Sequence, residues 1–467
     1  MSEPRTVRDP IHGFIRLSGE EADIVATRTF QRLRGIRQLA FANLIYPGAL
    51  HTRFEHTLGV FHVSSLLCDV FKFSAEDGRL VRLSALLHDL GHGPFSHVSE
   101  GALEIFADRT KLADRLKGDN PAKIHELVTQ DLLRTDPELQ RLIGRKMLES
   151  IEALLSHGYG EPVLRSVVSG PLDADKQDYL LRDSYHCGVK YGIFDLQQLH
   201  RELSVVEDRV DGKQLMITSD GVHALEQFVL AKHYLTAQVY THRVRLITDN
   251  MVVRSIVLGI EDDQIEELKK LYAYDGRAEF VTNYVRWDDA RFMLSFGNDS
   301  LDGKSCHELV QRLAHRRLLK QVFVEKLAGL PLSCREKLES ITKPSSRERR
   351  RTLEQRITEV IQAADVNLTT KLADPSKLVI VNSYKAKAVR EMSRNDEGPL
   401  LVRRGNDAPT TFENESDLFR SLSSEPTEAR FAVYAPVEYE NPAQRRDLQK
   451  KLREPILGAL EDFGNGE

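Results

Sequence analysis

Two short tracts of the sequence carry side chains that commonly bind metal ions. They are RFEH at residues 53–56 and HDLGH at residues 88–92. Side chains of neighbouring residues normally point apart, and a metal ion gives His88 and Asp89 one reason to turn inward together. Gly91 follows closely, so the helix that contains LSALLHD is predicted to end at this pair with a sharp turn. A further His and a further Asp would complete a site for the hydrolysis of phosphate esters.

His56 and the segment GPLDADKQDYLLRDSYH at residues 170–186 offer the missing ligands. A single helical histidine is more often structural, but the His-Asp pair downstream favours a ligand role for His56. Asp175, Tyr179 and Asp183 are spaced by four and share one helix face. A solvated charged face is the alternative, and two neighbouring leucines leave only a narrow polar stripe for it. Neutral imidazole and carboxylate suit Fe, Mn or Zn, and carboxylate also suits Mg.

The elements that must position these residues are mostly helices. From about residue 21 to residue 200, apolar residues recur at intervals of three and four. Two alternating runs around an Asp-Gly pair predict a β-hairpin over residues 203–219. One long or broken helix is predicted over residues 221–260, and the span 260–340 is mostly helical in pattern.

The last part of the chain changes character. The basic run KPSSRERRR at residues 343–351 is predicted to form a loop that enters the helix TLEQRITEVIQAA. KLVIVNSY, PLLVRRG and ARFAVYAPVEY then have β-type composition, and PAQRRDLQKKLREPILGAL closes the chain as a helix. These patterns predict a small α+β lobe.

Composition excludes several classes of protein. The 467 residues are 41% hydrophobic and 29% charged, as in ordinary globular proteins, and the net charge of -5 argues against a general nucleic-acid coat. The sequence shows neither a secretion signal nor an apolar stretch approaching 18 residues, so we expect a cytoplasmic protein without a membrane span. The four cysteines are far apart and are expected to be reduced, buried thiols: Cys68, Cys187, Cys306 and Cys334.

Five ordered tracts resemble the HD-domain metal phosphohydrolases, and most closely the deoxynucleoside triphosphohydrolases that combine a SAM domain with an HD domain. The tracts are DPIHG, FQRLRGIRQL, YPGALHTRFEHTLGV, LLHDLGHGPFSH and DADKQDYLLRD. The similarity runs to about residue 260 and more faintly into the C-terminal lobe. Only eight residues precede DPIHG, so a SAM domain is not expected in this sequence.

The resemblance implies a mostly α fold, in which an HD-domain helical bundle carries a small inserted β-hairpin and a C-terminal α+β lobe. We divide the chain into an HD phosphohydrolase core (1–260), a helical extension (261–345) and the α+β lobe (346–467). The resemblance also implies a homo-oligomer, either a dimer or a tetramer.

The resemblance assigns a role to each residue that matches the family. His56, His88, Asp89 and Asp175 would hold one divalent ion tightly (Fe, Mn, Zn or Mg). A second ion, Mg or Mn, is compatible with the resemblance. The ion would lower the pKa of bound water, and Arg53 and Lys176 would clamp phosphate oxygens. His97 is our choice of general acid, with Glu100 to orient it, and His92 and His125 add imidazoles beside it.

The same resemblance implies a deoxynucleotide substrate. Gln38 and Asp183 match positions that hold the 3′-hydroxyl, and Tyr240 matches the aromatic residue that leaves no room for a 2′-hydroxyl. Tyr179 would close that wall, and Leu39 would line the sugar and base. Lys232 stands where the family has a phosphate-binding arginine.

The matching activator site is altered. Gln31 and Arg34 agree with the family, but Ala26 replaces the aspartate that recognises guanine. A nucleotide activator is implied by the resemblance, and Ala26 argues against GTP in that role. Thr241 replaces a residue that contacts the base, so the base preference is open.

Three functions are compatible with the sequence. The first is hydrolysis of deoxynucleoside triphosphates to deoxynucleoside and triphosphate. The second is a metal-dependent nuclease or phosphodiesterase acting on DNA ends or single-stranded DNA, favoured by the altered activator site and the basic run. The third is a nucleotide sensor or scaffold without activity, against which the complete ligand set argues.

Overall fold

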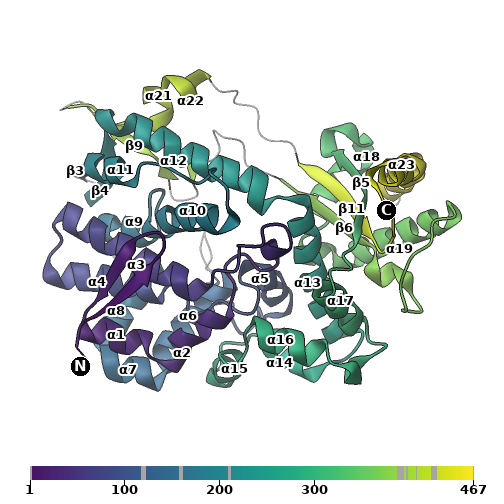
Figure 1. Ribbon diagram of the computed structural model, residues 1–467, viewed down its shortest axis with the longest axis horizontal. Helices are drawn as coiled ribbons and strands as arrows, with labels where there is room; N and C mark the ends of the chain where they lie inside the picture. Colours follow the sequence, from purple (N-terminus) through teal and green to yellow (C-terminus); the bar gives the residue numbers. More distant parts are fainter. Residues whose placement is uncertain are drawn as a thin grey trace.

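The computed structural model describes residues 3–116, 123–156, 161–208, 212–385, 394–395, 398–405, 408–421 and 429–465. Figure 1 shows a large helical body on the left and, at the right, a smaller lobe in which helices α18, α19 and α23 surround a sheet. The predicted fold class, mostly α with an inserted hairpin and a C-terminal α+β region, is confirmed.

The helices of the body are short to medium in length and follow the predicted apolar pattern. In chain order they are α1 (Gly19–Val25), α2 (Arg28–Gln31), α3 (Arg53–Phe71), α4 (Ala75–Leu87), α5 (His97–Phe106), α6 (Ile124–Thr135), α7 (Pro137–Ile143), α8 (Arg145–Leu155), α9 (Pro162–Val168), α10 (Ala174–Cys187), α11 (Leu196–Glu202), α12 (Val222–Leu235), α13 (Arg243–Glu261), α14 (Glu266–Tyr272), α15 (Ala278–Tyr284), α16 (Asp289–Phe296) and α17 (Ser305–Ala314).

Helix α3 is the central element of the body, and it packs against α4 and α10. The Glu55 carboxylate accepts the backbone N–H of Thr52 at 2.7 Å, which caps the start of the helix. The helix ends at Lys72, whose φ of 51° lies in the left-handed region. Most of its side chains are buried, so α3 fixes the positions of residues at both of its ends.

The helix predicted over residues 221–260 is broken. Between α12 and α13 the backbone makes a π-helical turn over Thr236–Tyr240, and turns of this kind are frequent at functional sites. The break places Tyr240 at the end of that turn, beside the start of α13.

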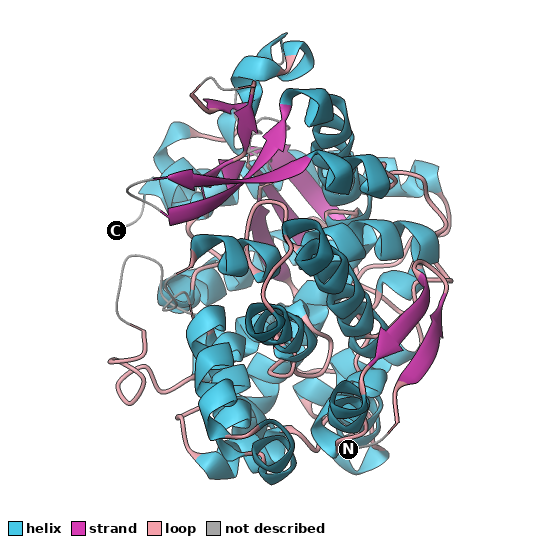
Figure 2. Cartoon of the chain, turned by 90° about the vertical axis from the view of Figure 1, so that its left-hand side faces the viewer, coloured by secondary structure: helices cyan, strands magenta, loops and turns pink. Residues whose placement is uncertain are grey.

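The helical body carries an N-terminal hairpin and a sheet that joins strands far apart in the sequence. The N-terminal hairpin pairs β1 (Arg5–Asp9) with β2 (Gly13–Leu17), and Figure 2 shows it on the outside of the helical body. The predicted second hairpin exists as antiparallel β3 (Leu203–Asp208) and β4 (Gly212–Thr218), although most of its turn lies outside the described residues. Strand β9 (Leu401–Arg403) returns to pair in parallel with β4, and β10 (Thr410–Thr411) extends the sheet.

The C-terminal lobe has a hydrophobic core of its own. Its sheet has the order β5 (Lys320–Lys326), β11 (Arg430–Ala435), β6 (Ile380–Tyr384), all antiparallel. Its helices are α18 (Leu332–Glu339), α19 (Arg347–Ala363) and α23 (Pro442–Asn465). The chain between β6 and β11 also forms β7 (Arg394–Asn395), β8 (Gly398–Pro399), α21 (Phe412–Glu415) and α22 (Asp417–Ser421), and these two helices lie beside β9 on the helical body. Strand β5 pairs with β11, and β4 pairs with β9, across the division at residue 346. The three-part domain division stays a prediction.

One prediction about this lobe is wrong. The basic run does not form a loop before the helix, because α19 begins at Arg347 and includes most of the run. Arg and Glu favour helices, and Arg347 and Arg351 form ion pairs with Glu261 at the end of α13. Contacts with a helix that is distant in the sequence cannot be predicted from the local pattern of residues.

All four cysteines are buried and free, as predicted. Among the described residues, the structure contains no helix that is both long and apolar enough to cross a membrane.

Candidate metal centre and nucleotide site

Helices α3, α4 and α10 bring three candidate ligands together. His56 lies in the first turn of α3, His88 caps the end of α4, and Asp175 lies in the first turn of α10. One ligand atom from each of these residues lies within 4.8 Å of the other two. The His56 Nε2 is 2.9 Å from Asp175 Oδ1, and the His88 Nε2 is 3.9 Å from the same oxygen.

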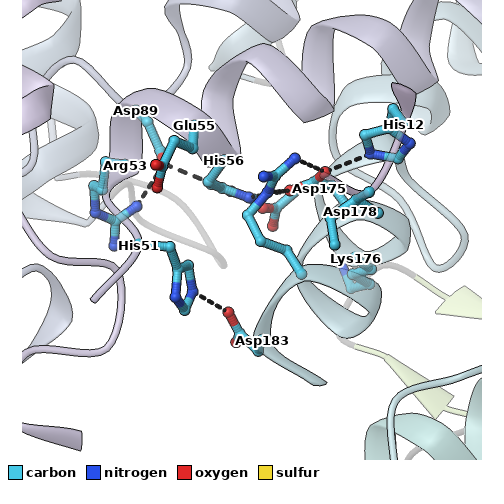
Figure 3. Close-up of polar contacts among 12 residues, drawn as sticks. His12, His51, Arg53, Glu55, His56, Asp89, Asp175, Lys176, Asp178 and Asp183 are labelled. Carbon is cyan, nitrogen blue, oxygen red and sulfur yellow. Dashed lines mark hydrogen bonds and ion pairs between the residues drawn. The ribbon is translucent and has the colours of Figure 1, made fainter. Parts of the chain in front are cut away.

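Asp89 completes the group. Its Oδ1 lies 3.2 Å from His88 Nε2, and its Oδ2 lies 3.7 Å from His56 Nε2. Arg53 donates from Nη1 to Asp89 Oδ2 at 2.5 Å, and this guanidinium is almost fully buried. Figure 3 shows Asp89 and Arg53 on one side of His56 and Asp178 on the other. The predicted His-Asp pair therefore does turn inward.

The donor set fits a divalent cation. The His88 Nδ1 is bonded to the Ala85 carbonyl at 2.7 Å, so its Nε2 faces the cluster. That Nε2 is buried and has no hydrogen-bond partner among the described residues, although Asp89 lies close to it. A buried nitrogen without a hydrogen bond is unfavourable, and a metal ion would satisfy it. Two imidazoles with two carboxylates are ligands typical of Fe, Mn or Zn.

The electrostatics of the cluster also favour positive charge. Burial by itself would lower the pKa of His56, but hydrogen bonds to Asp175 and Asp178 outweigh it and raise that pKa to about 10. Burial opposes ionisation of Asp89 and Asp175, yet Arg53 beside Asp89 and His56 beside Asp175 hold the pKa of both carboxyls below the usual range. The cluster is thus an anionic pocket that attracts either a proton or a cation.

A second cluster, the imidazole cluster of His92, His97, His125 and Glu100, lies beside the first. The Glu100 oxygens lie 2.7 Å from His92 Nδ1, 2.9 Å from His97 Nδ1 and 3.3 Å from His125 Nδ1. Burial alone would raise the pKa of Glu100. The three imidazoles outweigh this effect and hold that pKa well below its usual value. Only His97 is largely exposed, with 57% of its side chain accessible. The role of His97 as general acid stays a prediction.

The turn between the clusters has a constrained backbone. Phe95 and Ser96 have φ values of 63° and 56°, which residues other than glycine rarely adopt. The Phe95 N–H donates to Asp289 Oδ1 at 2.7 Å. The Ser96 hydroxyl accepts from Arg53 Nε at 2.8 Å and donates to the Arg37 carbonyl at 2.6 Å. These bonds fix Arg53, whose buried Nη2 has no partner among the described residues and suits a phosphate oxygen.

Of the residues predicted to bind the sugar, Tyr179 and Asp183 lie further along α10, and the others come from outside this helix. Asp183 accepts from Tyr240 Oη at 2.6 Å, and its other oxygen lies 2.8 Å from His51 Nε2. The rings of Tyr179 and Tyr240 are 6.2 Å apart and meet edge to face. Gln38 and Leu39 are buried in the same part of the body. The backbone N–H of Gln38 donates a hydrogen bond to the backbone carbonyl of His51 at 3.0 Å.

The two lysines predicted to bind phosphate lie in α10 and α12. The Lys176 ammonium donates to Asp173 Oδ2 at 2.6 Å and to the Gly170 carbonyl at 2.9 Å, so it is turned toward the start of α10. Lys232 is half-buried in the last turn of α12. Near the altered activator positions, Arg34 donates to Gln31 at 2.8 Å and covers the Phe54 ring.

Comparison with protein families now places the chain. The model described as HD domain matches residues 53–182, and the model described as HD associated region matches residues 194–453. The first contains every residue of the metal cluster. The chain belongs to the HD-domain phosphohydrolase superfamily.

This HD protein has relatives with and without an assigned activity. It is 35% identical over 266 residues to an uncharacterized protein of Methanocaldococcus jannaschii, covering 56% of this chain and 51% of that protein. It is 29% identical over 369 residues to the deoxynucleoside triphosphate triphosphohydrolase SAMHD1 of Homo sapiens, covering 73% and 58% respectively. The chain therefore spans a little over half the length of these curated relatives.

Solved structures support the fold of the HD protein. A phosphohydrolase from Bacteroides thetaiotaomicron superposes with a TM-score of 0.70 at 23% identity, covering 92% of this chain and 100% of that one. At this level of identity the likeness concerns the fold alone.

Several polar residues of the HD site were not singled out from the sequence. They are Asp9, His12, His51, Ser96, Asp178 and Arg182, all of which form the hydrogen bonds that hold predicted site residues or their neighbours. Asp178 had a local signal, because it lies one helical turn after Asp175. The other contacts join residues distant in sequence.

Proposed function

We propose that this protein hydrolyses deoxynucleoside triphosphates to deoxynucleoside and triphosphate with the help of a divalent metal ion. The observation that carries the proposal is the layout of α10, which presents Asp175 to the metal cluster and Asp183, about two turns later, to His51 and Tyr240. The names of the SAMHD1 relatives support the same substrate.

Each residue has a task in this reaction. A divalent ion held by His56, His88, Asp89 and Asp175 would supply Lewis-acid activation of water and of a phosphate oxygen. The Nη2 of Arg53 would stabilise charge on the α-phosphate, where water adds and the bond to the 5′-oxygen breaks.

The leaving group needs a proton. His97 would deliver it to the 5′-oxygen, while Glu100 holds the Nδ1 side of that imidazole. Tyr240 and Tyr179 would face the sugar, and the bond of Tyr240 to Asp183 fixes the phenol close to the carboxylate. A 2′-hydroxyl against these rings would be buried without a partner, which disfavours ribonucleotides.

The nuclease hypothesis lost part of its support. Arg347 and Arg351 pair with Glu261, and Arg350 pairs with Glu354 inside the lobe. These contacts account for most of the basic run without DNA.

The test is an incubation of the metal-loaded protein with each dNTP, each rNTP and a labelled single-stranded DNA, with and without nucleotide activators. We expect release of inorganic triphosphate from dNTPs, at least about 10-fold slower turnover of rNTPs, and intact DNA. Failure to release triphosphate from any dNTP under all conditions would refute the proposal, and cleavage of DNA in the same experiment would favour the nuclease.

A further inference from the structure

Asp178 is a buried carboxylate that lies behind the metal cluster. It is located one turn after Asp175 on α10 and is fully inaccessible to solvent. Its Oδ2 is bonded to His56 Nδ1 at 2.8 Å and to Arg182 Nε at 2.9 Å. Its Oδ1 is bonded to His12 Nε2 at 2.7 Å and to Arg182 Nη2 at 2.9 Å. Four donors therefore surround one carboxylate.

The bond to His56 determines which nitrogen carries the proton. An ionised carboxylate only accepts hydrogen bonds, so the His56 Nδ1 must be the donor. The lone pair that remains for a metal ion is then on Nε2, and Nε2 is the nitrogen that faces Asp175, Asp89 and His88. Two hydrogen bonds from the Arg182 guanidinium favour the ionised form of this carboxylate.

The outer part of the network reaches the N-terminal hairpin. Arg182 donates from Nη1 to Asp9 Oδ2 at 2.9 Å. The other Asp9 oxygen accepts the backbone N–H groups of Ile11 and His12, both at 2.9 Å. The turn between β1 and β2 is thereby tied to α10, and His12 reaches Asp178 from that turn, as Figure 3 shows.

Helices α3 and α10 pack closely at this carboxylate. Gly59 faces it from α3, one turn after His56. A Cβ atom at that position would overlap the Asp178 carboxylate and the Arg182 guanidinium. Because α3 and α10 approach each other this closely, Asp178 is held in one position relative to the His56 ring.

We propose that Asp178 is a positioning residue of the metal site, which fixes the His56 imidazole in the orientation and tautomer that present Nε2 to the ion. His12 and Arg182 hold Asp178 for this task, so the N-terminal turn is part of the site. The inference rests on the proposed metal binding but not on the substrate. Carboxylates that orient a ligating histidine in this way commonly contribute 10- to 100-fold to metal affinity.

The test measures Co²⁺ affinity and the visible absorption of the Co²⁺-loaded full chain in the absence of nucleotide. We compare Asp178→Asn and His12→Gln with a control, His62→Gln. His62 contacts the His12 ring at 5.0 Å and is not among the four donors to Asp178. Asp178→Asn is expected to bind Co²⁺ roughly 10- to 100-fold more weakly than the wild type and to shift the absorption spectrum. His12→Gln should show a smaller loss of affinity, and His62→Gln should bind Co²⁺ as the wild type does.

Three outcomes would overturn the proposal. The first is a folded Asp178→Asn with the Co²⁺ affinity and spectrum of the wild type. The second is an equal loss of Co²⁺ affinity in all three variants. The third, if Asp178→Asn does not fold, is an unchanged Co²⁺ affinity in His12→Gln. Thermal unfolding of each metal-free variant reports the fold. A wild-type protein that binds Co²⁺ but hydrolyses no dNTP would refute the proposed function and leave this inference standing.

Discussion

The metal cluster and the imidazole cluster are built from the same residue types, yet a fully buried histidine in each has its pKa shifted in opposite directions. His56 lies between Asp175 and Asp178, and its pKa is raised to about 10. His92 is equally buried, but burial together with the nearby Arg53 and His125 lowers its pKa to about 3. The difference teaches that neighbours, more than residue type, decide what a histidine does.

The ratio of the two residue types explains the contrast. Around His56 and His88 there are three carboxylates, so the metal cluster attracts cations. Around Glu100 there are three imidazoles and a single carboxylate, and His92 among them stays neutral. The two clusters meet where His92 Nε2 lies 3.2 Å from Asp89 Oδ1. We expect metal binding on one side of this contact and proton transfer on the other.

The largest effect should come from His88→Ala. The variant removes a ligand but only one hydrogen bond, from Nδ1 to the Ala85 carbonyl, so the fold should persist. Loss of metal activation, worth several kcal/mol, should lower turnover of dNTPs by about 10⁴-fold. Metal content and triphosphate release are measured on the same sample. A His88→Ala protein with full metal content and activity would remove the metal cluster from the mechanism.

A smaller effect is expected from His97→Gln in the imidazole cluster. Loss of a general acid typically lowers kcat by about 10²- to 10⁴-fold, while metal content should equal that of the wild type. Glu100→Gln serves as the companion variant, because it leaves the imidazole and weakens only its orientation, so a smaller loss is expected. If His97→Gln releases the metal ion, the two clusters are one site and the comparison fails.

The third prediction concerns Asp289, which anchors the turn between the clusters. Burial raises its pKa from 3.8 to about 6. The folded protein therefore binds this proton more tightly than the unfolded chain, and the resulting stabilisation is complete below pH 3.8 and lost as the pH rises toward 6. The shift corresponds to about 3 kcal/mol at most.

Asp289→Asn should abolish this pH dependence. The variant loses a hydrogen bond from the backbone N–H of Phe95 or Arg37 at every pH. Between pH 4 and pH 7, however, its unfolding free energy should rise relative to that of the wild type. Urea unfolding at several pH values provides the measurement. A wild-type-minus-variant difference that stays constant over this range would show that Asp289 ionises normally.

How much of this site the sequence predicts depends on the distance between partners. Asp175, Tyr179 and Asp183 were found from their spacing because they lie on one helix, where period and geometry are linked. The bonds from His51 to Asp183 and from His12 to Asp178 join residues 132 and 166 positions apart. No local pattern encodes such pairs, so the residues that hold the candidate ligands were missed although the candidate ligands themselves had a local signal.

The fold shows the same limit. Helices and the hairpin were predicted from local periodicity, and the closing helix of the lobe was placed correctly. The pairing of β9 with β4 was not predicted, because its partners, such as Ile217 and Val402, are distant in the sequence. The start of α19 was misplaced for a related reason, since the charges that stabilise its first turns belong to α13.

The smallest effect is expected far from both clusters, at Arg351. Its guanidinium is 46% exposed and pairs with Glu261 at 2.6 Å and Asp262 at 3.2 Å. Exposed pairs of this kind contribute about 0.5 kcal/mol and are screened by salt. Arg351→Gln should therefore lower the unfolding free energy slightly at low salt and leave dNTP turnover unchanged. If it instead abolishes binding of single-stranded DNA to the metal-loaded protein, the basic run serves a nucleic acid, and the two clusters would have to be reconsidered as the centre of a nuclease.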